Sequence, residues 1–123
     1  MTAQGFTDQG STTSDNLLAG EFPRIAELST VSGGKYARGT ILGKITASGK
    51  YTICTSAATD GSKDAYAVLA EAVDASEEDK QAVVYLTGEF NAAALTVGSG
   101  LTVDGLKDAL RAKSIFIKNN QAY

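Results

Sequence analysis

The chain has 123 residues, and its 11 basic and 14 acidic side chains give it a net charge of −3 at pH 7. A chain of this length suits one domain that buries roughly two thirds of its surface on folding. Its acidic balance and scattered Lys and Arg residues argue against a nucleic-acid partner, which requires clustered positive charge. No apolar run approaches the roughly 20 residues that cross a bilayer, and the N-terminus lacks the features of a signal peptide. We therefore expect a soluble, unexported protein without a membrane or nucleic-acid partner.

The first 16 residues, Met1 to Asn16, are mostly Thr, Ser, Gln, Gly and Asp, with Phe6 as their one aromatic residue. Such a composition buries too little apolar surface to offset the entropy lost on ordering. About 16 extended residues would reach on the order of 50 Å, which is far enough to cross a neighbouring subunit. We interpret residues 1–16 as a flexible N-terminal arm; a disordered terminus without a role is the alternative.

Apolar residues become frequent from Leu17 onward, and the first half of the chain predicts three strands. Pro23 cannot donate a backbone hydrogen bond, which favours an edge strand over Arg24–Val31. Arg38–Thr46 predicts a second strand with Ile41 and Leu42 on opposite faces. A turn over Ala47–Lys50 then predicts a hairpin with a third strand that begins at Tyr51.

Two longer alternating segments follow a polar loop, and they predict the centre of the fold. Ala65–Val73 and Gln81–Phe90 each alternate in apolar character with a period of two, which is typical of strands with one buried face. The link between them, Asp74–Lys80, is acidic and predicts a solvated turn. The side chains expected to be buried include Leu69, Val84 and Leu86.

The last part of the chain predicts one short helix and a final strand. Thr102 is a suitable N-cap for a helix over Val103–Ala112, in which Leu106 and Leu110 share one face. Ile115–Ile117 predicts the last strand, and residues 119–123 are expected to form a loose tail. The fold class is therefore mainly β (α+β).

The residues that usually carry chemistry are scarce in this sequence. There is no His, which removes the commonest general base and zinc ligand. Cys54 lies in a predicted strand and is more typical of a small buried hydrophobe than of a nucleophile. Glu71 and Glu89 would form a carboxylate pair only in one strand register, which the sequence does not settle. We expect no catalytic, cofactor-binding or metal-binding residues.

Three segments together resemble the head decoration proteins of tailed bacteriophages, of the lambda type. They are Ala37–Gly43 (ARGTILG), the Asp60-Gly61 turn that leads to AVLA at 67–70, and Leu86–Asn91 (LTGEFN), within a resemblance that spans residues 17–118. The resemblance implies a small barrel-like, tulip-like β fold that sits as homotrimers at local three-fold positions outside the capsid. It also implies the major capsid protein as partner, a cementing role after head expansion, and an arm that orders on the capsid. The location implied is the virion exterior, after synthesis in the host cytoplasm.

Candidate residues for the capsid contact come from the arm and from the first apolar cluster. They are Phe6, Leu17, Leu18, Phe22 and Pro23. Because the arm here lacks the proline of the lambda-like relative, contacts within the arm are not transferred residue by residue. Two other functions stay open at this point, a trimeric adhesion or receptor-binding module and a small Ser-Lys hydrolase.

Overall fold

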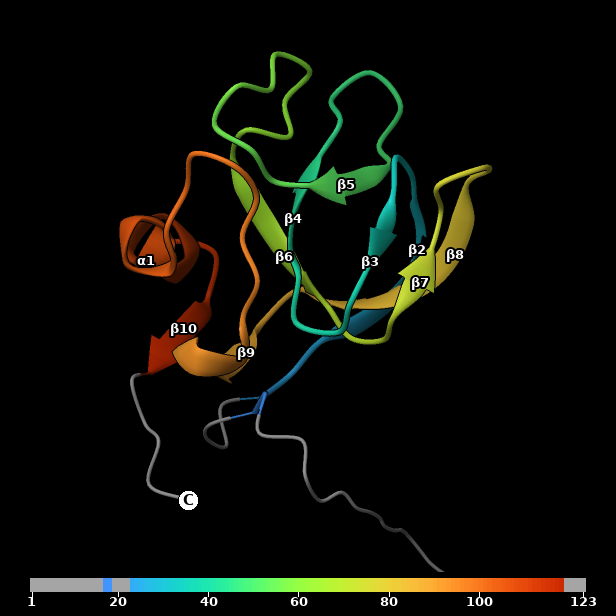
Figure 1. Ribbon diagram of the computed structural model, residues 1–123. Helices are drawn as coiled ribbons and strands as arrows, with labels where there is room; N and C mark the ends of the chain where they lie inside the picture. Colours follow the sequence, from blue (N-terminus) through green and yellow to red (C-terminus); the bar gives the residue numbers. More distant parts are fainter. Residues whose placement is uncertain (1–16, 19–22, 119–123) are drawn as a thin grey trace, which may run out of the picture.

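Five strands form a closed barrel at the centre of the protein, as the computed structural model shows for the residues it describes, 17–18 and 23–118 (Figure 1). They follow one another around the barrel in the order β2–β5–β4–β6–β8. Neighbouring strands are antiparallel, except that β2 and β5 are parallel and share only the pair Val31 and Tyr51. The strands are β2 (Ala26–Val31), β4 (Ile41–Lys44), β5 (Tyr51–Ile53), β6 (Ala65–Leu69) and β8 (Lys80–Tyr85). The mainly β class and the barrel are thereby confirmed.

A smaller layer covers one side of this barrel. Figure 1 shows α1, β9 and β10 grouped beside β6. Strands β9 and β10 pair in parallel, and a separate short ribbon joins β3 to β7. The bounds are β3 (Lys35–Tyr36), β7 (Val73–Asp74), β9 (Gly88–Asn91), the 3-10 helix η1 (Ala92–Ala94), α1 (Val103–Arg111) and β10 (Ile115–Lys118).

The short helix forms where its cap and its apolar spacing predict it. The Thr102 side chain accepts a hydrogen bond from the backbone N–H of Gly105, which satisfies one of the free donors of the first turn. Leu106 and Leu110 are both buried against the barrel side. The chain leaves the helix through Ser114, which adopts a positive φ of 66° and so turns the backbone into β10. No helix in the described part of the chain is long and apolar enough to span a membrane.

Apolar residues gather in two cores, one inside the barrel and one between the barrel and the α1 layer. Strand β4 separates them: the side chain of Ile41 belongs to the outer core, and that of its neighbour Leu42 belongs to the inner one. Both are fully buried. The predicted alternation of β4 is confirmed, and so is its hairpin with β5.

Three predictions about the strands are wrong. The segment 81–90 is not one strand but two, because the chain bends between β8 and β9 and Gly88 adopts a φ of 148°. Leu86 lies in this bend and is only partly buried. The predicted edge strand begins at Ala26 and is not an edge, since β2 pairs with β8 along its whole length and meets β5 at Val31.

The strand predicted over 65–73 is also shorter than expected. It ends at Leu69, where the chain bends before β7 pairs with β3. Leu69 and Val84 are fully buried, as predicted.

The first and last described segments pair with opposite edges of the same strand, β9. Leu18 bridges Phe90 of β9, and the backbone oxygen of Leu17 accepts a 2.7 Å hydrogen bond from the N–H of Asn91. On the other edge of β9, Lys118 of β10 stands opposite Asn91. Both ends of the described chain are therefore attached to the fold through β9.

Candidate interaction surfaces

The most exposed large apolar side chains of the described residues lie on one segment before and within β2. Ile25 is 56% exposed and Leu28 is 60% exposed. They are three residues apart, and Pro23 beside them is also exposed. We name the segment Pro23–Leu28 the apolar ridge. Because side chains alternate along an extended chain, residues three apart point to opposite sides, so Ile25 and Leu28 are two separate exposed apolar groups, each a candidate contact residue.

The apolar ridge is held in place by the bend that follows β8. The hydroxyl of Thr87 donates a 2.8 Å hydrogen bond to the backbone oxygen of Pro23 and accepts a 3.0 Å bond from the N–H of Ile25. The N–H of Leu86 donates a 2.7 Å bond to the backbone oxygen of Ile25. A segment fixed in this way loses little conformational entropy when it binds.

The predicted contact residues are placed in different environments. Leu17 is buried, with 2% of its surface exposed, and contributes to the outer core of its own chain. Leu18 is partly buried against the same core, whereas Pro23 is exposed. Phe6 and Phe22 lie outside the described residues, as do the predicted arm (1–16) and the predicted tail (119–123).

Sequence reasoning did not assign Ile25 and Leu28 to a contact surface, although a signal for Leu28 was present. Val31 is fully buried inside the barrel. Because side chains alternate along a strand, Leu28 must point away from the face that Val31 occupies. A large apolar residue on the outer face of a strand is a candidate contact residue.

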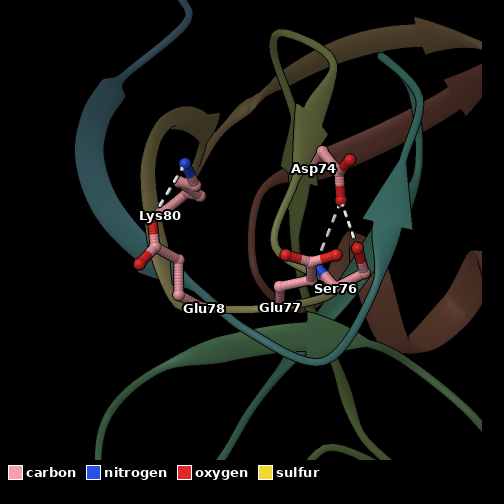
Figure 2. A pocket seen from close by; sticks show the side chains of 5 residues that line it. All are labelled: Asp74, Ser76, Glu77, Glu78 and Lys80. Atoms are coloured by element: carbon pink, nitrogen blue, oxygen red, sulfur yellow. Dashed lines mark hydrogen bonds and ion pairs between the residues drawn. The ribbon is translucent and has the colours of Figure 1, made fainter.

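The acidic turn, Asp74–Lys80, borders a hollow of about 420 Å³ (Figure 2). Asp74 accepts hydrogen bonds from the hydroxyl and the N–H of Ser76, and these bonds lower the pKa of the Asp74 carboxyl. Glu78 forms an ion pair with Lys80 at 3.1 Å. The residues of the turn are exposed, apart from Ala75 near its start, as a solvated turn requires.

The residues considered for catalysis are not brought together. Cys54 is fully buried, and its Sγ donates a hydrogen bond to the backbone oxygen of Lys63 at 3.1 Å. Burial raises the pKa of this thiol to about 11, with a smaller contribution from the charge of Asp64. The Glu71 carboxylate accepts from the N–H of Val83, whereas Glu89 forms its ion pair with Lys118. Within the described ranges, no group of three or more potential metal ligands was found.

Stability should fall at alkaline pH because of Cys54. The pKa of Cys54 in the folded protein, about 11, exceeds the ordinary value of 9.0. The contribution of the thiol to the free energy of unfolding is therefore complete below pH 9 and is lost as the pH rises toward 11. We expect wild-type protein to lose about 2 kcal/mol more than Cys54→Ala between pH 8 and pH 10.5 in urea denaturation. Tyr51, whose pKa is raised to about 12 by burial, is present in both proteins. Equal losses for wild type and Cys54→Ala would show that the thiol ionises as readily in the folded state as in the unfolded state.

Comparison with known proteins gives one family. The model of the family described as Bacteriophage lambda head decoration protein D matches residues 7–115. The match covers the whole barrel, the apolar ridge, the acidic turn and α1, and it ends at the first residue of β10. No curated protein matches the sequence.

Proposed function

The chain belongs to the family of the bacteriophage lambda head decoration protein D, and from this membership we propose that it binds the exterior of the expanded phage head as homotrimers at local three-fold positions. The family is structural and its members decorate the capsid, so the chain is a capsid decoration protein of the virion. The observation that carries the proposal is the family match over residues 7–115. The partner is the major capsid protein of the head, and the protein is made in the host cytoplasm before it attaches.

Cementing the head against the pressure of its DNA follows from multivalent attachment. A trimer joins several capsid subunits, and once one of its copies is bound the others act at a high effective concentration. Dissociation then requires that several contacts open together. A protein that binds only the expanded lattice also stabilises that lattice by mass action.

The apolar ridge is the attachment surface that we propose on the body of the protein. Ile25 and Leu28 offer exposed apolar area, and the hydrogen bonds of Thr87 hold the ridge before the partner arrives. Pro23, a contact candidate from the sequence, lies on the same ridge. Leu17 instead belongs to the core of its own chain.

Replacing Ile25 and Leu28 together with serine should weaken attachment to expanded heads without unfolding the protein. Buried apolar anchors contribute about 1–2 kcal/mol each to binding, so we expect an affinity loss of at least about tenfold per site. Both side chains are exposed in the free chain, so the unfolding free energy should change by less than about 1 kcal/mol. Cosedimentation with expanded heads measures the affinity.

The matched control replaces two exposed alanines of the α1 region, Ala109 and Ala112, with serine. This control should bind heads as the wild type does. If the ridge variant and the control bind equally well, the attachment surface lies elsewhere on the chain.

We also propose that residues 1–16 form an arm that binds the head. Their polar composition gives them little part in the core. Deleting them should leave the melting temperature of the free protein nearly unchanged and should weaken cosedimentation with expanded heads. Phe6→Ala in the full chain should reproduce part of the loss, by about 1–2 kcal/mol per site. Equal affinities for the full and shortened chains would remove the arm from the attachment mechanism.

A further inference from the structure

Two lysines converge on one tyrosine ring in a hollow of the surface. The Nζ atom of Lys44 lies 5.1 Å from the centre of the Tyr66 ring, and the Nζ atom of Lys113 lies 5.5 Å from it. Lys44 comes from β4, Tyr66 from β6, and Lys113 from the connection between α1 and β10. Two hollows of about 270 and 330 Å³ share Tyr66 and Lys113 as lining residues. We name Lys44, Tyr66 and Lys113 the lysine groove.

The positive charge of the lysine groove is not neutralised within the described part of the chain. The lysines that form ion pairs there are Lys50, Lys80 and Lys118. Asp64 lines one of the hollows but is not within ion-pair distance of either groove lysine. The tyrosine ring attracts both ammonium groups, yet it carries no net charge. In a chain whose net charge is −3, this pair of lysines offers positive charge that is complementary to a carboxylate.

The acidic turn offers the complementary group. Glu77 takes part in none of the ion pairs formed among the described residues, and Glu78 next to it is 72% exposed at its side chain. Figure 2 shows both carboxylates on the loop that borders the hollow. In Figure 1 the turn between β7 and β8 is far from the connection between α1 and β10, on the other side of the barrel. The turn cannot reach its own Lys113, so the two surfaces can meet only between two copies.

A three-fold ring needs two such surfaces on every chain. In a two-fold dimer the same patch meets itself, whereas in a ring of three each subunit offers one patch to the next subunit and a different one to the previous subunit. We propose that the acidic turn of one copy docks in the lysine groove of the next, with Glu77 bound between Lys44 and Lys113. This inference rests on the trimer of the proposed function and names the contact that closes it. The apolar ridge stays available for the capsid.

Disulfide trapping tests the contact directly. A chain that carries both Glu77→Cys and Lys113→Cys should form covalently closed trimers on mild oxidation, because each copy would link to both neighbours. Such bonds require Cα atoms within about 7 Å, whereas a Glu–Lys pair that meets at its side-chain ends can hold its Cα atoms further apart. A short bis-maleimide cross-linker is therefore applied in parallel with oxidation. Cys54 is fully buried and does not compete. The experiment is run on the free protein at high concentration and on protein bound to expanded heads, and non-reducing gels give the outcome.

The controls separate this contact from accidental collisions. Each single cysteine variant should give no trimer, and neither should Asp104→Cys combined with Lys113→Cys, which moves the acidic-side cysteine to the exposed first turn of α1. Closed trimers confined to the Glu77–Lys113 pair would support the inference. No trimers from that pair with either cross-linking chemistry, equal trimers from the control pair, or dimers from a single variant would overturn it.

Charge reversal gives a second measurement that needs no new cysteine. Glu77→Lys should weaken binding to expanded heads at least tenfold in cosedimentation, Lys113→Glu should do the same, and the two changes in one chain should restore most of the binding. Added salt should weaken the wild-type trimer. Additive losses in the doubly changed chain would contradict the contact. If wild-type protein binds heads but no cross-link forms, this inference fails while the proposed function stands. If cross-linked trimers form but do not bind heads, the inferred contact stands and the proposed function fails.

Discussion

Replacing Phe90 with alanine is expected to lower the free energy of unfolding by about 3–5 kcal/mol, because it leaves a large cavity in the outer core. Phe90 is fully buried in β9, and its ring lies 5.6 Å from that of Tyr85. It also joins three segments, since it pairs with Ile117 of β10 on one edge and bridges Leu18 on the other. Chemical denaturation of the free protein measures the loss.

Leu86→Ala is the matched control for this prediction. Leu86 lies four residues before Phe90 but is only partly buried in the bend after β8. Its truncation should cost less than half of what the Phe90 change costs, since part of the side chain is already in water. If both changes cost the same, the bend would be packed as tightly as the core.

Gly43→Ala is expected to be as damaging, although it adds only one methyl group. A Cβ atom at this position would lie 2.1 Å from the backbone oxygen of Ser62 and 2.6 Å from its Cα atom. The loop cannot move away freely, because the N–H of Thr46 donates a 2.9 Å hydrogen bond to the backbone oxygen of Asp60 and Gly43 itself pairs with Ala65 just after the loop. We expect a loss of about 3 kcal/mol or more, at the upper end of overpacking effects. Thermal and chemical unfolding of the variant would measure it.

Gly49→Ala separates steric clash from backbone strain. Gly49 has a φ of +75°, but the nearest atom to an added Cβ is the Cε of Lys44 at 3.9 Å. The change should therefore cost only the strain of a left-handed alanine, about 1–2 kcal/mol. A Gly43 variant as stable as the Gly49 variant would mean that the Ser62 loop yields easily.

Much of the fold could be predicted from local patterns. The β4–β5 hairpin follows from alternation and a short turn, and the helix follows from a cap at Thr102 with Leu106 and Leu110 on one face. Both signals depend on neighbours in the sequence. Such elements form where the chain itself sets the geometry.

The break between β8 and β9 could not be seen in the same way. Val84, Leu86 and Phe90 keep the spacing of a single strand, so alternation continues through the bend. The bend instead depends on a distant segment, since the N–H of Leu86 bonds to Ile25. Gly88 was the one local hint, because glycine inside a strand often marks an irregularity.

The candidate surfaces were only partly predictable for a related reason. Leu17 and Ile25 are both apolar residues near the start of the body, yet one is buried and the other exposed. The difference arises because Leu17 lies along β9, where its backbone oxygen binds Asn91. Sequence patterns identify apolar residues, but only the pairing of strands decides which of them face water.

The attachment of both chain ends to β9 determines where mechanical load enters the protein. A pull on residues before Leu17 acts first on the bond to Asn91 and the bridge to Phe90, both on a strand at the centre of the outer core. A pull through the C-terminal end reaches the same strand from β10 through four paired residues. Tension at either end is thus shared with Phe90 and its packing partners and does not peel β2 away from the barrel. With the proposed arm bound to the head, tension on the arm would therefore enter the body of the protein at β9 and not at the barrel strand β2.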